Sequence, residues 1–264
     1  MKPIPTLAVA ILSATTMVAS AAAAAPAVPA HADTIIKNVV LVHGATVDGS
    51  YWEQVYRELS QKGYHVTIAQ HPLTSFGADV AATQRVLSLQ DGPVVLVGHS
   101  YGGAVITAAG SDEKVKALVY VAAHAPDAGE SVADLNGKYP MESLKAVQAT
   151  PDGYIYVDRS KWREVIGADT PKSYSDFAAA NQVLTNGEAF GAKLQTAAWH
   201  LKPTYALVTI DDKTVSPYLQ RFMYERAKAQ TVEVKASHSV LVSQPKAVVD
   251  LIVTASKLRS SAAP

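Results

Sequence analysis

Cysteine is absent from this chain of 264 residues. The chain therefore has no disulfide framework, no zinc–thiolate site and no thiol nucleophile. An excess of charge of one sign is absent as well, because 23 basic residues balance 23 acidic ones. This balance gives no electrostatic signature for nucleic acid, which we do not expect as a partner. Since no spacing of histidines and carboxylates is typical of a metal site, we also expect neither a metal nor another cofactor.

Long hydrophobic runs are missing after the first 25 residues, and the start of the chain has the pattern of a secretory signal peptide. A positive start at Met1–Lys2 precedes the uncharged run Ile4–Ala25, and Ala30–Ala32 supplies small residues at the spacing of a cleavage site. We expect residues 1–32 to be removed, with cleavage after Ala21 as the alternative. The run lacks the Leu and Ile density of a membrane helix, which favours a cleaved leader over a retained anchor. We therefore expect a periplasmic or secreted protein without a stable membrane anchor.

Residues 33–264 show an alternation of short apolar runs and helical patterns. A continuous apolar run such as 39–42 is typical of a strand buried on both faces, whereas apolar residues at i, i+3, i+4 and i+7 in 52–59 indicate a helix. The alternation predicts one α/β domain with a doubly wound, mostly parallel sheet. The expected strands are 39–42, 65–69, 93–97, 115–122, 204–210 and 231–235, and the expected helices are 52–59, 76–87, 101–110, 219–227 and 248–255.

The alternation stops over residues 125–201. This segment holds helix-like pieces near 142–148, 160–167 and 173–184, together with a short aromatic run at 153–157. We interpret it as an inserted helical cap that lies over the carboxyl edge of the sheet.

A nucleophile motif lies between an expected strand and an expected helix. Gly98–Gly102 reads Gly-His-Ser-Tyr-Gly, which is the G-x-S-x-G pattern in the strand–turn–helix context that it requires. The sharp turn needs small neighbours, and it presents the Ser100 hydroxyl at the start of a helix, where N–H groups favour negative charge. We interpret Ser100 as a nucleophile; a glycine-rich corner without chemistry is the alternative.

A serine hydroxyl needs a base, and the base needs an orienting acid. His238 follows the expected strand 231–235 and is the last histidine of the chain. Asp212 follows the strand 204–210 and precedes a turn that ends in proline, a position that favours it over Asp211. We interpret His238 as the base and Asp212 as the acid, while a surface-loop histidine is the alternative for His238.

The tetrahedral intermediate of acyl transfer needs two N–H donors for its oxyanion. The first is expected from Tyr101, directly after the nucleophile, and the second from Ala45 in the loop after the first buried strand. Gly44 lets the backbone approach the substrate at this point. A simple tight turn is the alternative for this loop.

Further residues lie near expected strand ends or in the cap. Trp52, His124 and Trp199, together with Gly44, are candidates for the substrate pocket. For the aromatic residues, ordinary core packing is the competing interpretation. His65, His71 and His200 show no partner pattern, and we interpret them as structural.

These segments resemble the α/β-hydrolase superfamily, in particular its compact branch of bacterial serine esterases, plant methyl-ester esterases and hydroxynitrile lyases. The resemblance rests on Leu41–Ala45 with Trp52, on Gly98–Gly103, and on Asp212 with His238. It implies an α/β-hydrolase fold, a Ser–His–Asp triad and hydrolysis of a small-molecule carboxylic ester through an acyl-enzyme.

Two departures from the branch bear on the reaction. The hydroxynitrile lyases carry threonine where Gly44 stands and lysine where Ser239 stands, so the chain resembles an esterase rather than a lyase. An amidase, a thioesterase or a C–C bond lyase on the same scaffold remains an alternative, as does a binding protein with a vestigial site. The sequence leaves the oligomeric state and the acyl and alcohol groups of the substrate open.

Overall fold

A parallel sheet organises the part of the chain that this computed structural model describes, namely Met1, residues 34–139 and residues 141–258. Apart from Met1, the predicted signal peptide lies outside these described residues. Within them, a six-stranded sheet has the order β10–β9–β5–β4–β2–β3, and its neighbouring strands are parallel. The strands are β2 (Asn38–Val42), β3 (His65–Ala69), β4 (Val94–His99), β5 (Val115–Val121), β9 (Thr204–Thr209) and β10 (Gln230–Val234).

The central strands are buried on both faces. Successive side chains of a strand point to opposite faces, so Val39 and Leu41 of β2 pack in one core cluster, and Val40 and Val42 pack in the other. This two-sided burial explains why β2 reads as a continuous apolar run. The strand ranges expected from the sequence agree with the structure to within two residues at each end.

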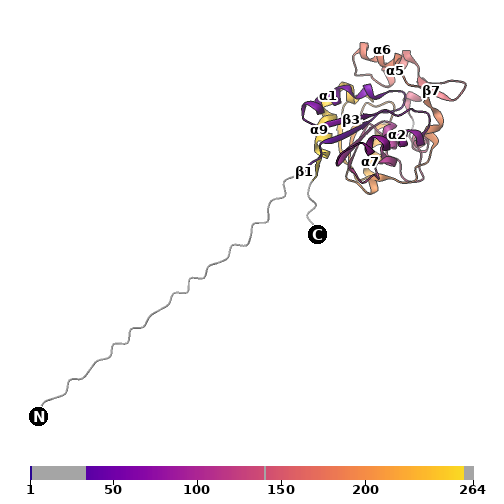
Figure 1. The fold of residues 1–264 in the computed structure, drawn as a ribbon. Helices are drawn as coiled ribbons and strands as arrows, with labels where there is room; N and C mark the ends of the chain where they lie inside the picture. The colour runs from indigo at the N-terminus through magenta and orange to yellow at the C-terminus, as the bar shows by residue number, and fades with distance from the viewer. Residues whose placement is uncertain (2–33, 140, 259–264) are drawn as a thin grey trace. The chain divides into compact units, whose positions relative to one another are not determined.

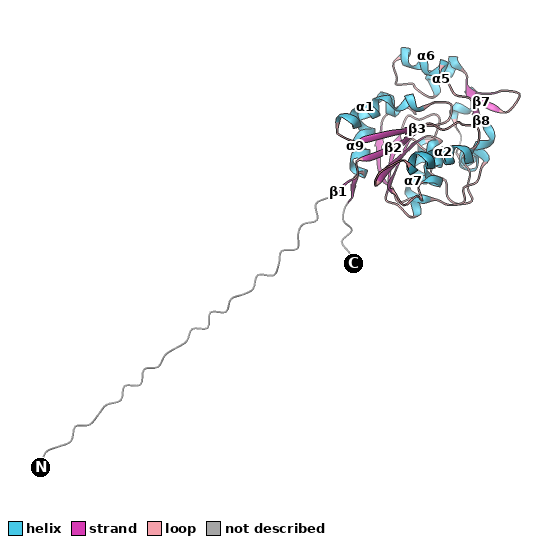
Figure 2. Ribbon diagram, viewed as in Figure 1, coloured by secondary structure: helices cyan, strands magenta, loops and turns pink. Residues whose placement is uncertain are grey.

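Helices cover both faces of the sheet (Figure 2). Side chains of α1 and α9 join the first core cluster, and those of α2, α3 and α7 join the second. The short strands β1 (Thr34–Ile35) and β11 (Lys257–Leu258) form a separate antiparallel pair. The helices are α1 (Glu53–Gln61), α2 (Phe76–Ser88), α3 (Gly102–Ala109), α7 (Pro217–Arg226), α8 (Val240–Ser243) and α9 (Pro245–Ala255).

The first helical segment begins earlier than its apolar pattern predicts. A 3₁₀ turn, η1 (Gly49–Trp52), precedes α1, and Asp48 caps it by accepting a hydrogen bond of 2.8 Å from the Ser50 N–H. An aspartate at this position satisfies a free N–H group at the start of a helical segment.

The segment between β5 and β9 forms the cap, whose elements α5, α6 and β7 lie together at one end of the domain (Figure 1). The expected helices near 160–167 and 173–184 are present, in shorter form. The cap also contains an antiparallel sheet in the order β6–β7–β8, and the aromatic run at 153–157 forms its central strand. The elements are α4 (Val132–Lys138), η2 (Glu142–Ala146), β6 (Val147–Ala149), β7 (Tyr154–Val157), α5 (Arg159–Val165), α6 (Lys172–Ala180), β8 (Thr185–Asn186), η3 (Gly187–Gly191) and η4 (Ala198–His200).

Candidate active site

Ser100 stands at the turn between β4 and α3. Its φ of 54° is in the left-handed region, which is costly for a residue other than glycine and persists where the surroundings enforce it. The turn needs glycine on both sides, because a Cβ on Gly98 would lie 2.6 Å from the carbonyl oxygen of Gly102, and a Cβ on Gly102 would lie 2.4 Å from that of His43. This is the geometry of a nucleophile elbow.

His238 and Asp212 lie in the loops that follow β10 and β9. The His238 Nδ1–H donates to Asp212 Oδ2 over 2.8 Å, and both side chains are buried. The competing Asp211 is exposed to solvent. The structure therefore brings His238 together with Asp212, as the motif position predicts.

Asp212 is held in this orientation by other donors as well. Since a carboxylate can accept several hydrogen bonds, these contacts leave it little freedom to turn away from His238. Its Oδ1 accepts from the N–H groups of Thr214 and Val215, at 2.7 and 2.9 Å, and its Oδ2 accepts from Thr209 Oγ1 and Gln220 Nε2, at 2.7 and 3.0 Å.

The loop of His238 is held from two sides. From the sheet, the His99 Nε2–H donates to the His238 carbonyl over 3.0 Å. From the cap, the Asp169 carboxylate accepts from the Ser237 N–H over 3.0 Å and from the Ser237 hydroxyl. Ser100 and His238 line one cavity, yet among the hydrogen bonds of the described residues none joins the Ser100 hydroxyl to the His238 ring. Such a contact often tightens only when substrate binds.

The two expected oxyanion donors belong to segments that adjoin Ser100, since Tyr101 follows it in the chain and the loop of Ala45 approaches it at Gly44. Within residues 34–139 and 141–258, neither the Ala45 N–H nor the Tyr101 N–H donates a hydrogen bond, so both can serve a ligand. Gly44 lets the first loop lie against the elbow, because a Cβ there would come within 2.9 Å of the Ser100 Cβ. Two unpaired N–H groups next to a serine are what an oxyanion site requires.

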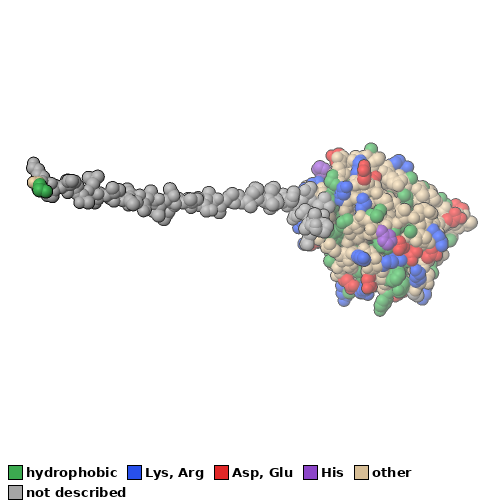
Figure 3. Space-filling view, turned by 90° about the horizontal axis from the view of Figure 1, so that it is seen from below, with side chains coloured by type: hydrophobic (Ala, Val, Ile, Leu, Met, Phe, Trp, Pro, Cys, Tyr) green, Lys and Arg blue, Asp and Glu red, His purple; other side chains and the backbone are tan. Residues whose placement is uncertain are grey.

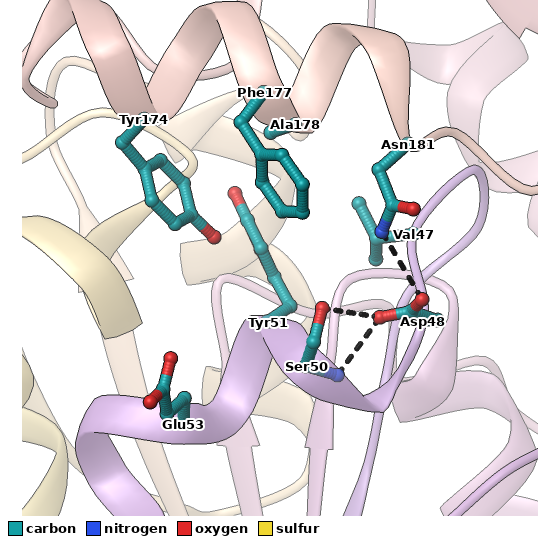
Figure 4. A pocket seen from close by; sticks show the side chains of 9 residues that line it. All are labelled: Val47, Asp48, Ser50, Tyr51, Glu53, Tyr174, Phe177, Ala178 and Asn181. Atoms are coloured by element: carbon teal, nitrogen blue, oxygen red, sulfur yellow. Dashed lines mark hydrogen bonds between the residues drawn. The ribbon is translucent and has the colours of Figure 1, made fainter.

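The cap holds the loop that carries Ala45. Thr46, the next residue, has a φ of 61° and is fixed at both backbone groups. Its N–H donates to Thr185 Oγ1 over 2.9 Å, and its carbonyl accepts from the Val183 N–H over 3.2 Å. Close by, the Asn181 side chain donates to Asp48 over 3.2 Å (Figure 4). The strained turn is thus stabilised by the segment that leads from α6 into β8.

A small hollow of about 60 Å³ lies beside this contact, between α6 and η1 (Figure 4). Tyr51 lines both this hollow and the cavity at Ser100, and its hydroxyl lies 2.5 Å from Ser239 Oγ. Burial raises the pKa of Tyr51 well above its usual value, so its hydroxyl stays neutral. Tyr51 is therefore part of the wall between the two spaces.

The cavity at Ser100 has a volume of about 540 Å³, within the range of small-molecule sites. Among the described residues that line it, there is no Asp, Glu, Lys or Arg. Most of its apolar lining comes from the cap, namely Met141, Leu144, Val147, Ile155, Val157, Ile166 and Phe190.

Of the four residues predicted to form the substrate pocket, one lies in the cavity lining and three do not. His124 lines the cavity, and its Nε2 lies 2.8 Å from Asn136 Oδ1. Trp52 and Trp199 lie in the core rather than in the cavity lining: Trp52, the last residue of η1, is fully buried in the first core cluster, and Trp199 donates through Nε1 to the Pro126 carbonyl over 3.0 Å. Gly44 is not among the lining residues and instead permits the close approach to Ser100.

Three buried imidazoles surround the elbow. Burial, reinforced by the neighbouring His71, lowers the pKa of His43 to about 3. Burial lowers the pKa of His124 to about 4, and burial with the nearby His238 lowers that of His99 well below its usual value. These three rings are neutral at neutral pH and act through hydrogen bonds and packing rather than charge.

Two contributors were missed in the sequence. Asp79 of α2 is fully buried and accepts a hydrogen bond of 2.8 Å from the Tyr101 hydroxyl. A signal was available, because Asp79 falls on the helical face of Phe76, Val80 and Thr83, where a lone acid among apolar residues is unusual. Thr185 gave no such signal, since its contact is with a residue far away in the sequence.

Other types of site are not indicated. Over the described residues, no group of three or more His, Asp or Glu side chains could hold a metal ion. In the same part of the chain, no helix combines the length and apolar character needed to cross a membrane. On the face shown in Figure 3, acidic and basic side chains are interspersed.

The class of the protein follows from comparison with a known family. The Alpha/beta hydrolase family profile matches residues 39–251, which include the elbow, the cap and both loops that carry Asp212 and His238. The chain belongs to the α/β-hydrolase family.

Several curated proteins are similar to parts of the chain. Lipase LipV of Mycobacterium tuberculosis is 32% identical over 139 residues, which is 47% of this chain and 48% of the lipase. A carbendazim hydrolyzing esterase of a Nocardioides strain is 33% identical over 36% of this chain and 45% of its own length. The chain thus spans about half the length of these two relatives. The alpha/beta hydrolase nvfD of Aspergillus novofumigatus is 25% identical over 81% of this chain and 94% of its own length.

Solved structures share the fold. Polyneuridine aldehyde esterase superposes with a TM-score of 0.73 at 19% identity, covering 83% of this chain and 98% of that one. A pyrethroid hydrolase from Sphingobium faniae superposes with a TM-score of 0.72 at 22% identity, covering 83% and 96%. At these identities the likeness extends to the fold alone.

Proposed function

We propose that this chain is a serine hydrolase that cleaves small, uncharged carboxylic esters through an acyl-enzyme intermediate. The observation that carries the proposal is the shared cavity: Ser100 on its strained elbow and His238 both line it, and His238 donates to the buried Asp212. The names of the lipase and esterase relatives support the same reaction class.

The proposed reaction proceeds in two halves. Ser100 Oγ attacks the ester carbonyl carbon while His238 Nε2 takes the hydroxyl proton, and Asp212 stabilises the resulting imidazolium. The carbonyl oxygen becomes an oxyanion that accepts from the Ala45 and Tyr101 N–H groups. His238 then gives its proton to the leaving alcohol. Water attacks the acyl–serine ester by the same steps, which releases the acid and restores Ser100.

The lining of the cavity supports an uncharged and largely apolar substrate. A charged acyl or alcohol group would lose its hydration in this cavity without an ion partner, at a cost of several kcal/mol. The cap residues Val147, Ile155 and Val157 offer an apolar wall for a chain or a ring. The volume of about 540 Å³ suits a substrate of moderate size rather than the smallest acetates alone.

Lyase chemistry is less well supported than hydrolysis. A lyase of this branch would need a positive group near Ser239, whereas the Ser239 hydroxyl donates to the Ile166 carbonyl over 2.9 Å and contacts the Tyr51 hydroxyl. Amide and thioester hydrolysis use the same atoms as ester hydrolysis, so a substrate panel separates them.

The test is a kinetic profile with p-nitrophenyl esters of increasing acyl length, beside matched amides, thioesters and a cyanohydrin. We expect ester hydrolysis to dominate and Ser100→Ala to lower kcat about 10⁴-fold or more. Ser88→Ala, at the exposed end of α2, is the matched control. Near-full esterase activity in Ser100→Ala would contradict the proposal.

We further propose that the chain is exported and that its leader is removed after Ala32 or Ala21. The support is the sequence pattern of residues 1–32. Expression in a bacterial host followed by amino-terminal sequencing of the exported protein is expected to give a start at Asp33 or Ala22. A chain that keeps Met1 and sediments with membranes would contradict this proposal.

A further inference from the structure

Asp79 is a buried carboxylate that the proposed reaction does not use. It lies in the first turn of α2 and is fully buried, although carboxylates are seldom found inside a protein unless they are bonded. The His71 ring lies beside it, with Nδ1 3.4 Å from Asp79 Oδ1, in contact but without a hydrogen bond. Its contacts link it to the segments that carry the two expected oxyanion donors, Tyr101 and Ala45.

We call the two connections from Asp79 to the expected oxyanion donors its arms, and the first arm runs directly to Tyr101. The Tyr101 hydroxyl donates to Asp79 Oδ2 over 2.8 Å, and the whole Tyr101 side chain is buried outside the cavity lining. The backbone of the same residue follows Ser100 and supplies one expected oxyanion donor. The Tyr101 side chain therefore connects the buried Asp79 carboxylate to the backbone that carries the N–H group next to Ser100.

The second arm passes through two stacked imidazoles. The His71 Nε2–H donates to the His43 carbonyl over 2.9 Å, and the two rings stack with centroids 3.7 Å apart and planes 7° apart. In return, the His71 N–H donates to His43 Nε2 over 3.3 Å, and the His43 Nδ1–H donates to the Gly44 carbonyl over 2.9 Å. This chain of contacts ends at the peptide that precedes Ala45, the other expected donor.

The third contact locks the loop that carries His71. The Leu73 N–H donates to Asp79 Oδ1 over 2.8 Å, and Leu73 has a φ of 58°, again in the left-handed region. A strained residue holds its conformation only where its surroundings enforce it, and Asp79 is one of the groups that do so. One carboxylate thus fixes Tyr101 and the loop between β3 and α2, and it reaches His71 through the Leu73 bond in that loop rather than through a bond to the ring.

We propose that Asp79 is a positioning residue that holds both oxyanion donors in place, Tyr101 directly and Ala45 through His71 and His43. This inference rests on the proposed esterase function. Oxyanion stabilisation depends on donors that are oriented before the charge develops, so a loosened donor costs rate rather than substrate affinity.

The decisive comparison is Tyr101→Phe against Tyr120→Phe. Both changes remove a hydroxyl from a fully buried tyrosine of the same core cluster, and the Tyr120 hydroxyl is also hydrogen-bonded, at 2.8 Å from Thr107 Oγ1. We expect Tyr101→Phe to lower kcat for a p-nitrophenyl ester about tenfold to a hundredfold with KM within about twofold, a part of what loss of a whole donor costs. Tyr120→Phe is expected to keep kcat within about twofold, whatever its effect on Tm.

A second readout follows the oxyanion itself. An alkyl trifluoromethyl ketone adds to the serine and forms a tetrahedral oxyanion, so its inhibition constant should rise by the same factor as kcat falls. Asp79→Asn keeps the size of the side chain but removes its charge and leaves one acceptor oxygen for the two donors, the Tyr101 hydroxyl and the Leu73 N–H, so it should lower kcat at least as much. The double variant Asp79→Asn/Tyr101→Phe should be no slower than Asp79→Asn alone, because both changes break the same arm.

The outcomes separate this inference from the proposed function. If Ser100→Ala keeps its activity, the proposed function fails. If Ser100→Ala is inactive while folded Tyr101→Phe and Asp79→Asn both match Tyr120→Phe in kcat and in ketone inhibition, only the positioning role fails. Should Tyr101→Phe not fold, the same comparison is made with Asp79→Asn alone.

Discussion

The carboxyl edge of the sheet and the cap contribute to the candidate site in different ways. The edge supplies the groups that we propose to react, because short loops after β4, β9 and β10 place Ser100, Asp212 and His238 there. The cap supplies the apolar wall and several contacts that hold those loops, through groups such as Thr185 and Asp169. In the proposed reaction, chemistry is therefore concentrated in one region, and shape and support in the other.

This difference predicts how variants of the two regions should behave. A change at the edge should remove chemistry and leave substrate binding nearly intact. A change in the cap should have a smaller effect on rate and act through the position of an edge group. The following predictions test this division, beginning with the largest effect.

Asp212→Asn is expected to lower kcat about 10⁴-fold, because the amide favours the wrong tautomer of His238. Asp211→Asn changes the neighbouring, exposed carboxylate in the same way and is expected to keep kcat within about twofold. Steady-state kinetics on one p-nitrophenyl ester measures both. Equal effects of the two variants would mean that the edge does not contain the acid that we assign.

Thr185→Val is expected to lower kcat about tenfold with little change in KM. The substitution leaves the Thr46 N–H buried without its acceptor, beside a strained φ and next to the Ala45 donor. Thr185→Ser restores the acceptor and is expected to recover most of the rate. If the valine and serine variants have equal kcat, the cap does not support the oxyanion loop through this contact.

The loss of stability at acid pH is expected to come from buried histidines at the carboxyl edge of the sheet. Burial lowers the pKa values of His43 and His124 to about 3 and about 4, and it also lowers that of His99. Between these values and the unfolded pKa, the rings bind protons in the unfolded chain but not in the folded one. Stability is then fully present above the unfolded pKa of about 6.5 and is lost as pH falls toward 4, by up to about 1.4 kcal/mol per pH unit for each ring.

Urea unfolding at several pH values between 7 and 4.5 measures this dependence. His124→Gln should reduce the slope of the unfolding free energy against pH, and His65→Gln is the matched control, at an exposed position of β3 whose ring makes no hydrogen bond or ion pair with the described residues. A slope that is equal in the two variants and the parent would assign the acid sensitivity to other groups.

The sequence revealed the edge because its signals are local. A buried parallel strand is a continuous apolar run, and an elbow requires glycine at fixed offsets from serine, so β4 and Ser100 could be placed from a few adjacent residues. Asp212 could be assigned because it follows such a strand, β9, whereas His238 is assigned by its place after β10, an exposed edge strand, and before the last helix.

The structure of the cap could not be predicted in the same detail, because it depends on contacts between residues that are far apart in the sequence. The antiparallel strands β6 and β8 are only three and two residues long, which is too short to show the alternation of apolar and polar residues typical of a strand. They are strands because they pair with β7. Trp52 and Trp199 were expected in the pocket, yet Trp52 is buried in the first core cluster and Trp199 is bonded to the Pro126 carbonyl in the second. An aromatic residue near a strand end fits both environments, and local sequence does not distinguish them.

The most direct test of the central claim is covalent labelling of the nucleophile. The protein is incubated with a fluorophosphonate, digested, and the labelled peptide is identified by mass spectrometry. We predict a single phosphonylated serine, Ser100, loss of esterase activity in proportion to labelling, and no label in folded Ser100→Ala. Hydrolysis of p-nitrophenyl esters that persists while Ser100 stays unlabelled, or a label on another serine, would contradict the account.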